Sequence, residues 1–298
     1  MQLDVLSNIS VIVSAFWCPG NFSASQILRC FRPVDLAYSL IDGRNSETPL
    51  VFLHGLLGSK SNFHSISKAL FQRTGRTVVT VDSRNHGDSG HSPVMTYEAM
   101  SLDLQNMLSK LELPECILIG HSMGGKIAMT TALQNPRLVR KLVVVDISPV
   151  RTISQTPFPD YIAAMKAVTV DETLSRSSAR TQADKQLQLC IEDARTRQFI
   201  LTNLVERNGR YIWRVNLEAI ANSFDYLLGF PDFNTPFTAP TIFLGGDNSS
   251  YISSKEYPEI KRLFPNSIIQ HVPEAGHWVH SEKPYDFINA ICAFLGTS

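Results

Sequence analysis

The sequence predicts an α/β fold with a mostly parallel central sheet, flanking helices and an inserted helical cap. From residue 34 onward, short β-branched runs alternate with longer amphipathic segments, which is typical of strands joined by crossover helices. Runs such as LVVV at 142–145 are apolar throughout, as expected for strands that are buried on both faces. The alternation stops at about 150–236, where the pattern becomes helical, and this block is the predicted cap.

The alternating pattern predicts the positions of the strands and helices. Strands are predicted at 34–41, 50–54, 77–82, 116–120, 141–146, 241–245 and 267–272. Helices are predicted outside the cap at 62–73, 96–111, 124–135 and 283–295, and inside it at 161–168 and 196–204. The Asn-Gly pair at 208–209 lies between residues of β character and predicts a hairpin over 205–213.

The composition is that of an ordinary globular protein, with 298 residues, 44% hydrophobic residues and a formal net charge of zero. One domain over 34–298 that contains the cap fits this length better than two independent domains. Nucleic acid is not an expected partner, because binding to a phosphate backbone depends on a surplus of Lys and Arg. No apolar stretch approaches the roughly 18 to 20 residues that span a membrane, so no transmembrane segment is predicted.

Residues 1–33 are interpreted as a leader that precedes the folded domain. The mildly apolar stretch 5–18 follows Asp4 rather than a basic residue, which is unfavourable for a secretory signal. The stretch 23–32 contains two serines and two arginines and no acidic residue, which is typical of an organelle transit peptide. The five cysteines lack the spacing of a zinc site or a disulfide framework, so neither is expected.

The run GHSMGG at 120–125 is the first candidate for chemistry. It follows the apolar strand at 116–120 and precedes a predicted helix, which is the context of a G-x-S-x-G nucleophile elbow. In that tight turn, small residues must flank a serine held at the end of the sheet, at a helix N-terminus that favours negative charge. Ser122 is therefore the predicted nucleophile.

The run HGLLG at 54–58 follows an earlier strand, where an acyl-transfer enzyme of this kind needs a backbone donor for the oxyanion. Attack on an ester carbonyl generates a negatively charged oxygen, which two preorganised N–H groups can stabilise. The backbone N–H groups of Leu56 and Met123 are the predicted donors. The alternative interpretation of this run is a plain turn between a strand and a helix.

The predicted base is His277, in a loop after the last strand. A serine hydroxyl needs a base, and in this arrangement the histidine comes last in the chain, after the nucleophile and the acid. His86 is interpreted as part of a turn that shapes the site, and His280 as a neighbour on the same loop. The acid is less well defined, because Asp146 and Asp247 each follow a predicted strand and each could also cap a local turn.

These motifs together resemble the α/β-hydrolase superfamily over residues 34–298. The resemblance is carried by VFLHGLLGSK at 51–60, VDSRNHGDS at 81–89, GHSMGGK at 120–126, VDISP at 145–149, WRVNL at 213–217 and AGHWVH at 275–280. It implies a serine esterase or lipase that cleaves small-molecule carboxylic esters, with acylglycerols and a diacylglycerol-lipase-like activity among them. It also implies no metal or organic cofactor, and a mitochondrial location with the cytoplasm as the alternative.

The sequence departs from the superfamily at the acid. The usual acid after the penultimate strand would correspond to Ser249, which has no carboxylate. The resemblance therefore favours Asp146, with Asp247 as the fallback and Glu218 of the cap as a third carboxylate.

Two other functions remain open at this point, namely acyl transfer to an acceptor other than water and ligand binding without turnover. A dehalogenase on this fold would need a carboxylate in place of Ser122. The apolar side chains of the predicted cap would suit an acyl chain, but they could equally pack between the cap and the core; these are Tyr161, Met165, Phe199, Phe224 and Tyr226.

Overall fold

A computed structural model describes residues 32–153 and 157–297. Within it, Pro33–Ser298 form one compact unit, which is the subject of everything that follows. The predicted leader over 1–33 lies almost entirely outside the described residues.

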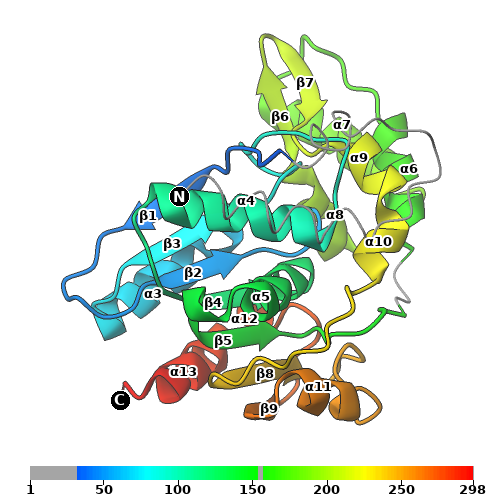
Figure 1. Ribbon diagram of the computed structural model, residues 1–298. Helices are drawn as coiled ribbons and strands as arrows, with labels where there is room; N and C mark the ends of the chain where they lie inside the picture. Colours follow the sequence, from blue (N-terminus) through cyan, green and yellow to red (C-terminus); the bar gives the residue numbers. More distant parts are fainter. Residues whose placement is uncertain (1–31, 154–156, 298) are drawn as a thin grey trace, which may run out of the picture. The chain divides into compact units, whose positions relative to one another are not determined.

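Seven strands form one sheet in the order β1-β3-β2-β4-β5-β8-β9 (Figure 1). All neighbouring strands are parallel except the pair β1 and β3. The α/β prediction is therefore confirmed, and each predicted strand is present: β1 (Tyr38–Ile41), β2 (Leu50–Leu53), β3 (Val78–Val81), β4 (Cys116–His121), β5 (Val139–Val145), β8 (Thr241–Gly246) and β9 (Ser267–Val272).

The first strand is shorter than the predicted range 34–41. The N–H of Val34 donates to Oδ1 of Asp103 at 2.8 Å, and the N–H of Ala37 donates to Oγ of Ser89 at 2.8 Å. The carbonyl of Ala37 still accepts from the N–H of Asp82 at 2.8 Å, but side chains take the N–H groups of Val34 and Ala37, and the strand begins at Tyr38.

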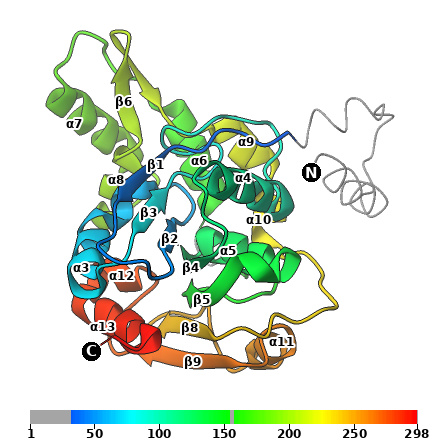
Figure 2. The ribbon, with the colours of Figure 1, turned by 60° about the vertical axis from the view of Figure 1, so that its left-hand side comes forward.

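Helices cover both faces of the sheet (Figures 1 and 2). Alternate strand residues divide between two apolar clusters, so that Val51 and Leu53 face one layer while Leu50 and Phe52 face the other. The first layer contains α4 (Tyr97–Lys110) and α5 (Met123–Gln134), and the second contains α3 (His64–Thr74) and α13 (Pro284–Leu295). All four were predicted to within two residues at each end.

Short helices complete the body of the molecule. They are η1 (Lys60–Phe63), η2 (Pro136–Leu138), α11 (Tyr257–Leu263) and α12 (Val279–Glu282), none of which was predicted as a separate helix. Each spans two turns or fewer, which is too short for helical periodicity to appear in a sequence. Of the helices in the described parts of the chain, none is long and apolar enough to cross a membrane.

Among the described residues between β5 and β8, in the region predicted as the cap, there are five helices and a hairpin. They are α6 (Phe158–Ala167), α7 (Arg176–Leu187), α8 (Ala194–Leu201), β6 (Leu204–Arg207), β7 (Arg210–Trp213), α9 (Leu217–Asn222) and α10 (Phe224–Leu228). The hairpin prediction is confirmed, with Asn208 and Gly209 both at positive φ in the turn, as a type I′ turn requires. Helix α7 was missed because it buries only Ala179, Ala183 and Leu187.

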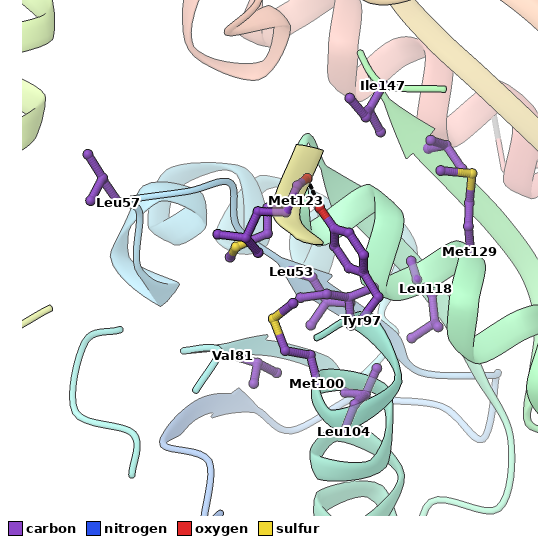
Figure 3. Close-up of a cluster of buried hydrophobic side chains, with 14 of the residues drawn as sticks. Leu53, Leu57, Val81, Tyr97, Met100, Leu104, Leu118, Met123, Met129 and Ile147 are labelled. Carbon is purple, nitrogen blue, oxygen red and sulfur yellow. Dashed lines mark hydrogen bonds between the residues drawn. The ribbon is translucent and has the colours of Figure 1, made fainter. Parts of the chain in front are cut away.

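Figure 3 shows how α4 packs under the cap. Tyr97, Met100 and Leu104 point from α4 toward Leu118 of the sheet and Met123 of α5. A dashed line marks the hydrogen bond that the hydroxyl of Tyr97 donates, and its acceptor is the carbonyl of Leu227 at 2.6 Å. The buried face of α4 therefore contacts both the body and the end of the cap.

A buried ion pair fixes the loop after β3 to α4. The guanidinium of Arg84 donates from Nε and Nη2 to the two carboxylate oxygens of Asp103, at 2.6 and 2.7 Å, and both side chains are almost fully buried. Replacing Asp103 with Asn is expected to lower the free energy of unfolding by about 3 to 5 kcal/mol, because it leaves the arginine charge buried without its partner. Urea unfolding followed by circular dichroism measures this change.

The matched control is Asp35→Asn, which breaks an exposed ion pair with Lys110. We expect that change to cost less than about 1 kcal/mol, because solvent screens exposed pairs. Equal effects of the two substitutions would mean that the buried pair contributes no more than a surface pair.

Candidate active site

Ser122 occupies the turn between β4 and α5. Its backbone has φ 53° and ψ −119°, a conformation that is strained for a residue with a side chain. The backbone is crowded there, because a Cβ on Gly120 or Gly124 would lie 2.2 Å from a backbone oxygen. The glycines of the motif thus allow the turn, and Ser122 directly precedes the free N–H groups at the start of α5.

The loop after β2 lies against this turn. A Cβ on Gly55 would be 3.3 Å from the Cβ of Ser122. The N–H of Leu57, a residue with φ 61°, donates to Nε2 of His86 at 3.1 Å and so holds the loop in place. Leu56 and Met123, the two predicted oxyanion donors, line one narrow cavity together with Ser122.

His277 lies in the loop between β9 and α12, and its ring is held on several sides. Its Nδ1 is 2.7 Å from Oδ2 of Asp146. Its ring stacks on that of Tyr251, with centroids 4.1 Å apart and 22° between the planes. The carbonyl of His277 accepts a hydrogen bond from Nε2 of His121 at 2.8 Å, so this nitrogen of His121 carries the proton. His277 and Ser122 line the same large cavity.

Asp146 directly follows β5 and is buried to 1% exposure, whereas His277 keeps 20%. Three donors face its carboxylate. The N–H of Gly246 donates to Oδ1 at 3.1 Å, and the hydroxyl of Ser249 donates to Oδ2, which also contacts His277. Ser249 thus occupies the position where the resemblance expects an acid, and it donates a hydrogen bond to the carboxylate of Asp146, which follows the neighbouring strand.

The two other candidate carboxylates lie elsewhere. Asp247 is exposed in the turn after β8, where its N–H donates to the carbonyl of Val272 at 3.1 Å. Glu218 forms an ion pair with Lys166 at 2.8 Å on the surface of the cap. Among the described residues, Asp146 is the carboxylate that contacts His277.

Two cavities meet at Ser122. The narrow one is about 40 Å³ in volume and lies toward α4, α5 and the end of the cap, whereas the large one is about 780 Å³ and extends toward α8. Tyr161 and Phe199 of the cap line the large cavity and Phe224 lines the narrow one. Of the two interpretations left open for these side chains, packing fits Met165, which is fully buried, whereas Tyr226 is 56% exposed and lines neither cavity.

Comparison with known proteins agrees with this geometry. The family model described as alpha/beta hydrolase fold matches residues 48–284. The chain belongs to the α/β-hydrolase family. It is 56% identical over 273 residues to the sn-1-specific diacylglycerol lipase ABHD11 of Danio rerio, covering 92% of this chain and 86% of that protein. The lipase of the same name from Mus musculus is 55% identical over 273 residues, covering 92% and 89%.

A solved structure supports the same assignment. The structure titled marine microorganism esterase superposes on this α/β-hydrolase with a TM-score of 0.81 at 35% identity, covering 88% of this chain and 99% of that one. Together with the relatives above, this likeness identifies the chain as a carboxylic ester hydrolase.

Two histidines near the site, His86 and His280, are buried and neutral. Burial, followed by the charge of a neighbouring histidine, lowers the pKa of His86 and of His280 to about 3. His86 donates from Nδ1 to the carbonyl of Arg84 and accepts from Leu57, which confirms its predicted role in shaping the site. His280 packs between Phe63 and His121, as expected for a structural neighbour.

Sequence reasoning missed two residues around His277, namely His121 and Tyr251, and named Ser249 only as a position that lacks a carboxylate. His121 lies inside the nucleophile motif, where its position next to Ser122 was the available signal. Ser249 and Tyr251 follow the carboxyl end of β8, the edge of the sheet at which an α/β fold builds its sites. A search for polar and aromatic residues after every strand would have found Tyr251 and indicated a hydrogen-bonding role for Ser249.

Proposed function

We propose that this carboxylic ester hydrolase acts by a serine mechanism, with Ser122 as the nucleophile, His277 as the base and Asp146 as the acid that orients the base. The observation that carries the proposal is the 2.7 Å contact between Nδ1 of His277 and Asp146, at the edge of the cavity that Ser122 also lines. Because Nδ1 donates to the carboxylate, Nε2 is left unprotonated and can accept the proton of a serine hydroxyl.

The proposed reaction has two halves. Oγ of Ser122 attacks the carbonyl carbon while its proton passes to Nε2 of His277, and the N–H groups of Leu56 and Met123 stabilise the oxyanion. The bond from that carbon to the alcohol oxygen then breaks, and His277 returns the proton to the leaving alcohol. Water repeats the sequence on the acyl-enzyme, which releases the carboxylic acid and restores Ser122.

Acylglycerols are the proposed substrate class. Four aromatic side chains of the large cavity's lining suit an apolar part of a substrate; these are Phe158, Tyr161, Phe199 and Trp278. The printed names of the ABHD11 relatives, which are diacylglycerol lipases, favour the same class. Release of fatty acid from diacylglycerols of short and long acyl chains, measured on the purified protein, tests this part alone.

A fluorophosphonate probe tests the serine mechanism. We expect the purified protein to form one covalent adduct per chain, located at Ser122 by peptide mass spectrometry, because capture requires an activated serine. Heat-denatured protein is the control and should remain unlabelled. Native protein that stays unlabelled and turns over no ester would instead support a binding protein on this fold.

A further inference from the structure

Both cavities open on the proposed nucleophile, but they differ in what else they contact. Leu56, Ser122, Phe158 and Tyr251 line both. His277 lines the large cavity and is not among the residues that line the narrow one. An ester bound at Ser122 would therefore place one of its two substituents in each cavity.

The chemistry of the proposed function decides which substituent goes where, and the inference rests on that function. The leaving alcohol oxygen takes a proton from His277, so the alcohol part must lie on the side of His277. That side is the large cavity. The acyl group stays bonded to Oγ of Ser122 and extends the other way, into the narrow cavity.

Leu227 and Leu228, at the end of α10, form a wall of the narrow cavity, here called the end wall, and two buried side chains of the body hold it. Tyr97 of α4 donates to the carbonyl of Leu227 at 2.6 Å (Figure 3). Lys126 of α5 donates from Nζ to the carbonyls of Leu228 and Gly229, at 2.8 and 2.7 Å. Side chains of α4 and α5 thus hold three consecutive backbone carbonyls by hydrogen bonds. Both donors line the cavity, and so do two of the residues that they hold; these four are Tyr97, Lys126, Leu227 and Leu228.

Lys126 also connects the two ends of the cap. Its third hydrogen bond is donated to Oγ1 of Thr152 at 2.8 Å, and the N–H of Thr152 donates to the carbonyl of Leu228 at 2.7 Å. Burial, followed by the positive charge of Arg151, lowers the pKa of Lys126 to about 7. A neutral amine keeps two N–H donors, enough for the two carbonyls, so the end wall can be held in either charge state.

We propose that the narrow cavity is the acyl site and that Tyr97 and Lys126 are specificity-determining residues, which limit its depth by holding residues 227–229. At about 40 Å³ the narrow cavity is far smaller than the large one at about 780 Å³, so the group that it accommodates is short compared with the group in the large cavity. The preferred substrates are esters of short acyl groups with large apolar alcohols, which the cavity of about 780 Å³ accommodates.

Two series of esters test the proposal. The first combines acetyl, butyryl and octanoyl groups with one alcohol, and the second combines the acetyl group with alcohols of increasing length. For the wild-type protein, kcat/KM should fall by about tenfold or more from acetate to octanoate. In the second series, kcat/KM should not fall as the alcohol becomes longer. Equal or higher kcat/KM for octanoate would overturn the assignment of the acyl site.

Variants then test the two residues. Tyr97→Phe and Lys126→Met each remove hydrogen bonds to the end wall, and each should raise the ratio of kcat/KM for octanoate over acetate by about tenfold. Phe199→Ala, in the large cavity, is the matched control and should alter the alcohol series but leave the acyl ratio unchanged. An acyl ratio that stays at its wild-type value in Tyr97→Phe would refute the role of the wall.

The outcomes distinguish a failure of the acyl-site assignment from a failure of the proposed function. Tyr97→Phe removes a single oxygen atom, so it supplies the test even where Lys126→Met does not fold. If the wild-type protein hydrolyses no ester of either series, the proposed function itself fails. If it hydrolyses them without acyl preference, only the assignment of the narrow cavity fails.

Discussion

Replacing Ser122 with Ala is expected to lower kcat for ester hydrolysis by about 10⁵ to 10⁶-fold, to the level that the oxyanion donors and substrate binding alone support. Without Oγ no acyl-enzyme can form, so the variant should also lose all labelling by a fluorophosphonate. Turnover of a short activated ester by the purified variant, together with a thermal unfolding curve, measures the loss and shows that the fold is retained.

Ser67→Ala provides the matched control. Ser67 is a buried serine on α3, on the opposite face of the sheet from α5, and its hydroxyl donates to the carbonyl of His64 at 3.0 Å. We expect this variant to keep wild-type turnover. Substantial hydrolysis by Ser122→Ala would exclude Ser122 as the nucleophile and with it the proposed mechanism.

The sheet was predictable because its strands are buried on both faces. Runs such as those that became β4 and β5 are apolar throughout, and burial of such runs between two helical layers is what selects them as strands. The loops that follow the strands were predictable for the same reason, since they begin where the apolar runs end. The local sequence therefore predicts that Ser122, Asp146 and His277 follow strands at the same edge of the sheet.

The cap was harder to predict because its helices bury few side chains. Helix α7 presents mostly polar residues and α10 spans only five, so neither gives a clear apolar period. The hydrogen bonds of Lys126 could not be predicted at all, because Leu228 and Gly229 lie about a hundred positions away in the chain. Nothing near Lys126 in the sequence distinguishes it from a solvated lysine.

The choice between Asp146 and Asp247 also exceeded what local sequence can decide. Both follow a strand of the same parallel sheet, so both reach the edge that carries the site. What separates them is the direction of each side chain. Asp146, with φ 48°, contacts His277, Gly246 and Ser249, whereas Asp247 is exposed in its turn.

Because Asp146 contacts His277 and Asp247 does not, we expect Asp146→Asn to lower kcat by about 10³ to 10⁴-fold. Asp247→Asn is the matched control, and we expect its effect to stay below tenfold, as we do for Glu218→Gln. Measurements of kcat with one ester on variants of equal thermal stability give the ranking. A larger loss in Asp247→Asn than in Asp146→Asn would transfer the role to Asp247.

The size of the Asp146→Asn effect follows from the three donors around the carboxylate. The amide of an asparagine has one acceptor oxygen, and the N–H of Gly246 can only donate, so the oxygen should face Gly246 and the NH₂ group should face His277. Nδ1 of His277 must then accept, which moves the imidazole proton to Nε2. A protonated Nε2 cannot take the proton of Ser122, so the variant should retain its fold and its cavity but hold the base in the wrong tautomer.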